Sequence, residues 1–178
     1  NLGSFTTTVG GNFATTGAGV FQSAIATTQL NVTGNVSIAG GASTATAGQL
    51  QVGRNFVQGG AANAFVASGT HRTLISGSAG VAQNITFANA PTSRFNRLDI
   101  VDITRNIVIQ SNVFVADTLL MRGGSGASNL IGAGTTQRLT ANGALVMIWS
   151  TLSPRLAPPV LEINATPAVG NIGAGGGI

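Results

Sequence analysis

The segments LNVTGNVSIAG at residues 30–40 and LQVGRNFVQGG at residues 50–60 decide the fold, because the second repeats the pattern of the first. The positions identical in both are Leu30, Val32, Asn35 and Gly40, which match Leu50, Val52, Asn55 and Gly60. A related segment, VGGNF at residues 9–13, precedes them, and its Val9 and Asn12 align with Val32 and Asn35. A repeat of this kind, with apolar residues at alternate positions, predicts a chain of stacked coils.

The same period returns downstream, where Leu98 matches Leu119 and Leu119 matches Leu139. Over residues 98–121, pairs of apolar residues two positions apart recur at every sixth position, which is typical of short strands with one buried face. Three such strands in each coil of about 20–23 residues predict a β-solenoid with rungs about 4.8 Å apart.

The expected fold is therefore all-β: a β-solenoid, specifically a right-handed β-helix of about eight coils. Stacking should place Leu30 over Leu50, and Leu98 over Leu119 over Leu139. Residues 61–97 follow the period less well, which leaves a β-sandwich with an exchanged strand as the alternative.

Asn12, Asn35 and Asn55 occupy the same position in three successive repeats. Asparagine suits tight corners, because it tolerates the left-handed backbone conformation and its side chain hydrogen-bonds to neighbouring backbone. Two interpretations stay open: the residues are turn formers only, or their stacked amides form a ladder along the solenoid.

Composition excludes most enzyme classes. The chain has no lysine, no cysteine and a single histidine, so it lacks a Walker A lysine, a thiol nucleophile and a thiolate metal site. Its eight arginines are scattered from Arg54 to Arg155, which argues against a nucleic-acid partner. The longest apolar run, residues 144–149, is too short to span a membrane.

Carboxylates are the remaining candidates for catalysis. Asp99 and Asp102 are the closest pair, but their odd spacing in a strand-like run places them on opposite faces, so we interpret them as solvated surface charges. Asp117 and Glu162 stand alone in the sequence. We expect no catalytic residue and no enzymatic activity.

His71 lies at the expected start of a strand, without a G-x-S-x-G motif elsewhere, and is interpreted as structural. The segment GGSGASNLI at residues 123–131 is similar to a calcium-binding nonapeptide, but Ser128 replaces the aspartate that would bind the ion. We therefore expect no metal site and no cofactor.

Three segments carry a resemblance to known sequences: SGTHRT at 68–73, GVAQNITF at 80–87 and SRFNRL at 93–98. They are followed by apolar pairs repeated at six-residue spacing, which end at residues 123–124. This stretch resembles the repetitive regions of large bacterial surface and secreted proteins of the adhesin or autotransporter-passenger type. The resemblance implies a β-helical fold, a role in adhesion or extracellular matrix, and an extracellular or cell-surface location. The start at Asn1 instead of methionine predicts a processed or excised chain.

The two ends of a solenoid expose strand edges with which other chains can pair. Prolines and glycines near the C-terminus predict a boundary between a solenoid domain, residues 1–150, and an extended arm, residues 151–178. We expect residues 160–163 to add a strand to a neighbouring subunit. The expected assembly contacts are the apolar residues Leu145, Val146, Met147, Ile148, Trp149, Val160, Leu161 and Ile163.

The sequence thus predicts an extracellular structural protein, the subunit of a self-assembling filament, sheath or biofilm matrix, whose partner is a further copy of itself. The alternative is an adhesin shaft, or a β-helix module that binds or degrades carbohydrate and has surface glycans as its partner.

Overall fold

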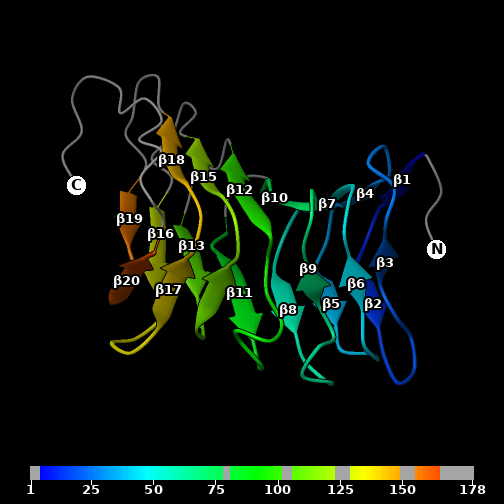
Figure 1. The fold of residues 1–178 in the computed structure, drawn as a ribbon, viewed down its shortest axis with the longest axis horizontal. Coiled ribbons are helices and arrows are strands. Elements are labelled where there is room, and N and C mark those ends of the chain that lie inside the picture. The colour runs from blue at the N-terminus through cyan, green and yellow to red at the C-terminus, as the bar shows by residue number, and fades with distance from the viewer. Residues whose placement is uncertain (1–4, 78–80, 102–105, 123–128, 149–154, 165–178) are drawn as a thin grey trace.

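The computed structural model describes residues 5–77, 81–101, 106–122, 129–148 and 155–164. Within these residues it contains strands and no helix, and each paired strand runs parallel to its neighbour. Figure 1 shows the strands stacked along one axis, from β1 near the N-terminus to β19 and β20 at the other end. The predicted β-solenoid is confirmed.

The solenoid has three faces. The first is sheet A, in the order β1 (Thr6–Val9), β4 (Gln29–Val32), β7 (Gln49–Val52), β10 (Arg72–Ile75), β12 (Arg97–Val101), β15 (Leu119–Arg122) and β18 (Leu145–Ile148). The second is sheet B, in the order β2 (Phe13–Thr15), β5 (Val36–Ile38), β8 (Phe56–Gln58), β11 (Gln83–Phe87), β13 (Asn106–Ile109), β16 (Asn129–Gly132) and β19 (Arg155–Ala157).

The third face consists of two short sheets. Sheet C contains β3 (Gln22–Ser23), β6 (Thr44–Ala45) and β9 (Val66–Ala67), and sheet D contains β14 (Val113–Val115), β17 (Arg138–Ala141) and β20 (Val160–Ile163). Single bridges from Val66 to Arg94 and from Phe95 to Val115 join the two sheets into one face. Sheets A and B each hold seven strands, one fewer than the eight coils expected.

Alternation along most strands explains which residues are buried, whereas β12, β15 and β17 each bury three successive residues. Leu30 and Leu50 are paired in β4 and β7, and Leu98 and Leu119 are paired in β12 and β15, as predicted. The predicted step from Leu119 to Leu139 is wrong. Leu119 pairs with Leu145, whereas Leu139 pairs with Val113 and Leu161 on the third face.

The irregular stretch at residues 61–97 belongs to the same solenoid. Strands β9, β10 and β11 lie there and join parallel sheets, which contradicts the β-sandwich alternative. Coil length varies because the corners differ in length: Gln29 is in register with Gln49, but Arg72 is in register with Arg97, so the later coil is the longer one. The right-handed sense of winding stays a prediction.

Phenylalanine rings form a column inside the solenoid. Phe56 contacts Phe65, Phe87 and Phe95 with ring centroids 5.0–5.4 Å apart, and Phe21 lies 6.1 Å from Phe65. Phe56 and Phe65 lie in the third coil, and Phe87 and Phe95 lie in the fourth. Such aromatic contacts add stability beyond the area that they bury.

Serine side chains bond the backbone beside this column. The hydroxyl oxygens of Ser43, Ser93 and Ser111 accept hydrogen bonds from the backbone N–H groups of Phe21, Phe65 and Phe87, at 2.7, 3.1 and 2.7 Å. In each pair the serine belongs to the following coil. These bonds satisfy backbone donors where the strands turn.

The corner asparagines form a ladder. Asn12 accepts a hydrogen bond from the backbone N–H of Asn35 at 2.9 Å through its Oδ1 atom, and Asn35 accepts one from Asn55 at 3.1 Å. Asn55 accepts one from Asn84 at 2.8 Å. The bonds run from side chain to backbone, while one amide–amide bond joins Asn35 to Asn12 at 3.2 Å.

Strand pairing continues beyond the expected domain boundary at residue 150. Strand β19 pairs with β16, and β20 pairs with β17, so residues 155–157 and 160–163 supply the last coil of the solenoid. This corrects the expected arm over that part of residues 151–178. The hydrophobic pattern VLEI at residues 160–163 explains the result, because its alternate positions match the stacked positions of β17.

Candidate functional site

The C-terminal end of the solenoid carries most of the predicted assembly residues. Leu145 and Met147 are half-buried and pack against the core from β18, which pairs with β15 on one side only. Val146 is half-buried, and 39 % of Ile148 is exposed. Trp149 lies outside the described residues.

The open edge of β18 presents backbone donors and acceptors. The carbonyl oxygen of Ala144 accepts a hydrogen bond from Leu119, so Ala144 faces β15. Because successive residues in a parallel strand bond to opposite sides, the N–H and C=O groups of Leu145 and Met147 face the open edge. Nothing within the described residues pairs with this edge.

The third face ends at β20, which contains Val160, Leu161 and Ile163. Strand β20 pairs with β17 of its own chain on one side, and its pairing with a neighbouring subunit stays a prediction. Arg138 and Glu162 form an ion pair of 2.6 Å across these two strands. The hydrogen bond from Arg138 lowers the pKa of Glu162, with a further contribution from Asn164.

The N-terminal end has the complementary open edge. The carbonyl oxygens of Phe5 and Val9 accept hydrogen bonds from Gln29 and Thr33 of the second coil. By the same alternation, the N–H and C=O groups of Thr6 and Thr8 face away from β4. Nothing in the described part of the chain pairs with that side of β1.

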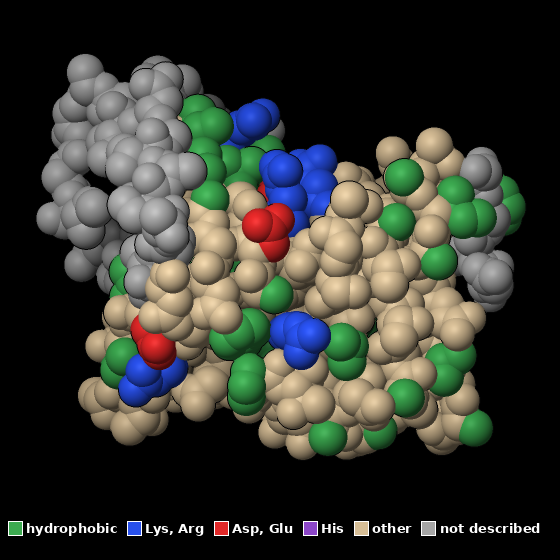
Figure 2. Space-filling model, in the orientation of Figure 1, with side chains coloured by type: hydrophobic (Ala, Val, Ile, Leu, Met, Phe, Trp, Pro, Cys, Tyr) green, Lys and Arg blue, Asp and Glu red, His purple; other side chains and the backbone are tan. Residues whose placement is uncertain are grey.

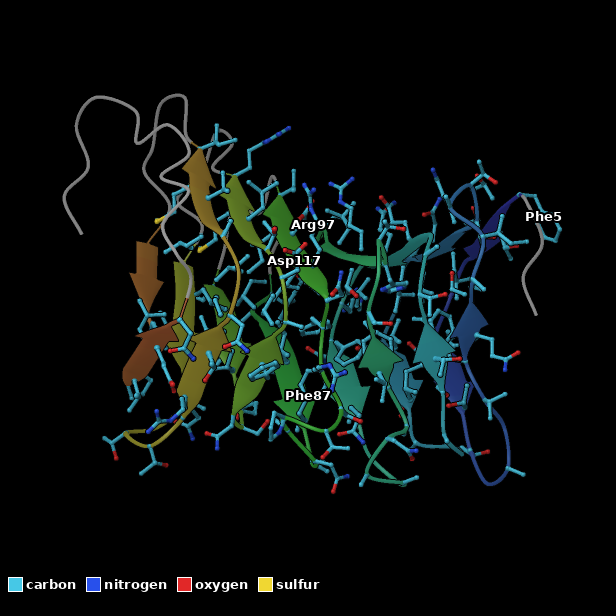
Figure 3. All side chains as sticks on the ribbon, in the orientation of Figure 1. Phe5, Phe87, Arg97 and Asp117 are labelled. Atoms are coloured by element: carbon cyan, nitrogen blue, oxygen red, sulfur yellow. The ribbon has the colours of Figure 1, made fainter. Side chains whose placement is uncertain are left out.

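Apolar side chains are exposed around the first coil. The exposed fractions are 57 % for Phe5, 47 % for Val20 and 41 % for Ile25. Figure 3 shows Phe5 at the N-terminal end of the rod, directed away from the body. These side chains lie close to an open sheet edge, a combination typical of surfaces at which chains associate.

The two ends match each other in geometry. Both end in parallel strands of sheets A and B, and one copy translated along the axis would bring β18 beside β1 of the next copy. The core column that begins at Thr7 passes through Leu30 and ends at Leu145. In such a stack Leu145 would lie over Thr7, and Met147 over Val9, continuing the buried columns from copy to copy.

Asp99 lies in a different environment from the one expected. Its side chain is fully buried, and it forms ion pairs with Arg72 at 2.5 Å and with Arg97 at 2.8 Å. The interpretation of Asp99 as a solvated charge is therefore wrong. The two arginines are adjacent in register on β10 and β12, so each covers one side of the carboxylate. Asp102 lies outside the described residues.

Arg97 also faces Asp117, whose side chain is exposed, and the two are neighbours in Figure 3. The hydrogen bond with Asp99 raises the pKa of Arg97. Arginine thus lies beside both carboxylates. This arrangement suits a structural ion-pair cluster, because the guanidinium groups occupy the oxygens of Asp99 that a substrate would have to reach.

His71 is completely buried and directly precedes β10, consistent with the structural interpretation. Its ring contacts Phe21 and Phe65 edge-on, with centroids 6.2 and 5.9 Å apart. Neither ring nitrogen has a hydrogen-bond partner among the described residues. Burial lowers the pKa of His71 to about 4.

Titratable side chains are sparse and scattered in the described part of the chain. No group of three or more His, Asp or Glu side chains gathers in the described ranges. Ser128 and most of the glycine-rich segment lie outside them, while Asn129–Gly132 form β16. The described residues also contain no helix long and apolar enough to cross a bilayer.

Charge is distributed unevenly along the rod. Residues 1–53 contain no charged side chain, and Arg54 is the first. On the face drawn in Figure 2, charged side chains lie over the central and C-terminal coils and none lies over the N-terminal end. The surface of the first two coils is therefore uncharged and combines neutral polar residues with the exposed apolar side chains of Phe5, Val20 and Ile25.

No family model matches the chain, and no curated protein or solved structure matches it.

Proposed function

We propose that this chain is the subunit of an extracellular filament, sheath or matrix that grows by stacking the last coil of one copy on the first coil of the next. The supporting observation is the pair of open sheet edges at the two ends, each beside partly exposed apolar side chains. The polarity of the parallel strands makes the contact head-to-tail. A head-to-tail contact does not close on itself unless the rotation forms a ring, so it produces open polymers.

Backbone hydrogen bonding and the burial of apolar side chains both favour this contact. Backbone N–H and C=O groups of Thr6 and Thr8 would pair with those of Leu145 and Met147, which satisfies donors and acceptors at both edges. The half-buried side chains of Leu145 and Met147 would lose their remaining exposure to water. Charged residues make up only 7 % of the chain, so electrostatic repulsion between copies is small.

An extracellular location rests on the resemblance to bacterial surface repeats and on the composition. A filament of stacked parallel coils needs no disulfide for stability, because each coil is held by its neighbours. The chain has no cysteine. This is compatible with the oxidising surroundings of a secreted polymer, where free thiols would react.

The test blocks the open edge of β1 without disturbing the pairing of β1 with β4. The Thr6→Pro/Thr8→Pro variant removes two N–H groups that face the open edge, and proline is tolerated on edge strands. The matched control, Thr6→Val/Thr8→Val, keeps both N–H groups and a β-branched side chain. Polymerisation is followed by negative-stain electron microscopy and sedimentation velocity.

We expect filaments from the natural chain and from the valine variant, and folded monomers from the proline variant. Circular dichroism confirms that the proline variant retains its sheets. Monodisperse short rods from the natural chain at all concentrations would contradict the proposal, as would filaments of the proline variant. Dimers without further growth would also contradict it, because they would indicate a symmetric contact between like ends.

A further inference from the structure

A shallow groove of about 530 Å³ lies over the corner between sheets A and B in the first three coils. Arg54 in the third coil occupies the position that Gly34 and Gly11 occupy in the second and first. The N–H of Arg54 bonds to the carbonyl of Gly34, and the N–H of Gly34 bonds to that of Gly11, both at 3.0 Å. One arginine thus lines the groove in register with two glycines.

Close backbone packing between the first two coils fixes the floor of this groove. A Cβ atom at Gly34 would lie 2.5 Å from the Gly11 carbonyl oxygen and 2.5 Å from Asn12 Oδ1, which no side chain can tolerate. In contrast, no atom lies within 4 Å of a Cβ atom built at Gly10 or Gly11. The corner of the second coil is therefore packed directly on that of the first, and the free space lies beside Gly10 and Gly11 of the first coil.

The groove has one strong hydrogen-bond donor without an acidic partner. Arg54 is exposed, and its guanidinium forms no ion pair within the part of the chain that the structure describes. No acidic residue precedes Asp99 in the sequence. The remaining lining is neutral and polar, with the side chains of Asn12 and Thr33 and the backbone of the glycines.

We propose that this groove binds an acidic polysaccharide, with Arg54 pairing with a uronate carboxylate while the neutral lining hydrogen-bonds to sugar hydroxyls. A guanidinium binds a carboxylate through two parallel N–H···O bonds, which fixes orientation as well as charge. A peptide fits less well, because the groove has no aromatic or large apolar side chain to anchor one. A nucleic acid fits less well, because a single cation neutralises too few phosphates.

The site includes residues of the first coil, on which the next copy would stack, so binding is measured on monomers. It is tested by isothermal titration of the purified chain with sodium polygalacturonate at low salt, with neutral dextran as the comparison polymer. Arg54→Gln removes the charge, and Gly11→Leu fills the free space above the floor. The matched control is Arg122→Gln, which removes an exposed arginine of β15 outside the groove.

We expect the natural chain to bind polygalacturonate and not dextran. Arg54→Gln and Gly11→Leu should each weaken binding at least tenfold, and Arg122→Gln less than twofold, with the circular dichroism spectrum unchanged in all three. Absence of binding by the natural chain would overturn the proposal, and so would equal binding of dextran. Equal weakening by Arg54→Gln and Arg122→Gln would also overturn it, because the polyanion would then bind through the net positive charge of the protein and not through the groove.

Discussion

The side-chain oxygen of Asn55 accepts a hydrogen bond from the backbone N–H of Asn84 at 2.8 Å, although 29 residues separate the two in sequence. The same contact joins Asn12 to Asn35 and Asn35 to Asn55, where the separations are 23 and 20 residues. The asparagine therefore keeps its place in the corner when the coil length changes. It ties each of the first three coils to the next at the turn from sheet A to sheet B.

Removing one rung of this ladder should destabilise the solenoid. In Asn55→Ala the N–H of Asn84 loses its acceptor, and we expect the free energy of unfolding to fall by about 1 to 2 kcal/mol. Asn63→Ala, at an exposed turn, is the control and should have little effect. Urea unfolding followed by circular dichroism measures both variants, and equal effects would show that the ladder contributes no stability.

Gly34 is fixed by close approach of the backbone, not by an unusual conformation. A methyl group in Gly34→Ala would meet the Gly11 carbonyl oxygen at 2.5 Å, so the corner must move. We expect a loss of about 2 kcal/mol or more in stability, comparable to an overpacked core. Gly11→Ala adds the same methyl group in open space, and its melting temperature should stay close to that of the natural chain.

The buried carboxylate of Asp99 should be essential to the stability of sheet A. In Asp99→Asn the stacked cations Arg72 and Arg97 would face each other without their shared counter-charge, and breaking a buried ion pair costs about 3 kcal/mol. The partial exposure of both arginines makes this an upper value. Asp117→Asn removes an exposed carboxylate near Arg97 and should cost about 0.5 kcal/mol or less. Urea unfolding measures both variants, and equal losses would contradict the prediction.

His71 should make stability depend on pH. The unfolded chain takes up a proton at the ordinary pKa of 6.5, but burial holds the folded pKa near 4. The unfolded state therefore binds more protons between these values, and stability falls as the pH decreases from about 6.5 to about 4, by about 3 kcal/mol at most. Above pH 7, His71 should no longer make the free energy of unfolding depend on pH.

The His71→Leu variant separates this effect from that of the carboxylates. It removes the titrating ring from its place between Phe21 and Phe65, and its urea unfolding should show a flat stability between pH 6.5 and 5. Glu162, whose pKa is lowered, loses its contribution only as the pH falls below its ordinary value of 4.5. An unchanged slope in His71→Leu would assign the pH dependence to other groups.

The sequence predicted the solenoid because the first three coils differ little in length. Leu30 and Leu50 align in both sequence and structure, and comparison of the sequence with itself finds such pairs. Comparison of the sequence with itself fails where a corner contains extra residues. Leu119 pairs with Leu145 because the coil between them is longer, whereas a fixed period pointed to Leu139. The contact of Asn84 with the asparagine ladder was not predicted for the same reason, because 29 residues separate it from Asn55.

The candidate site was predictable only in part. The apolar run at residues 145–148, which the sequence indicated as assembly residues, forms the terminal strand of sheet A, and its role in assembly stays a prediction. The groove beside Arg54 depends on which residues stack over one another in three coils, and the burial of Asp99 depends on an arginine of the preceding strand in sheet A. Such contacts are set by register between coils, which local pattern does not contain.

The absence of charge in residues 1–53 gives the rod an electrical polarity. All eight arginines and four acids lie farther along the chain, so the formal charge of +4 belongs to one part of each subunit. A polymer joined head-to-tail would carry this charge in bands, separated by neutral spacers. Growth of that kind places two uncharged coils between the charged parts of adjacent copies, whereas two C-terminal ends brought together would repel.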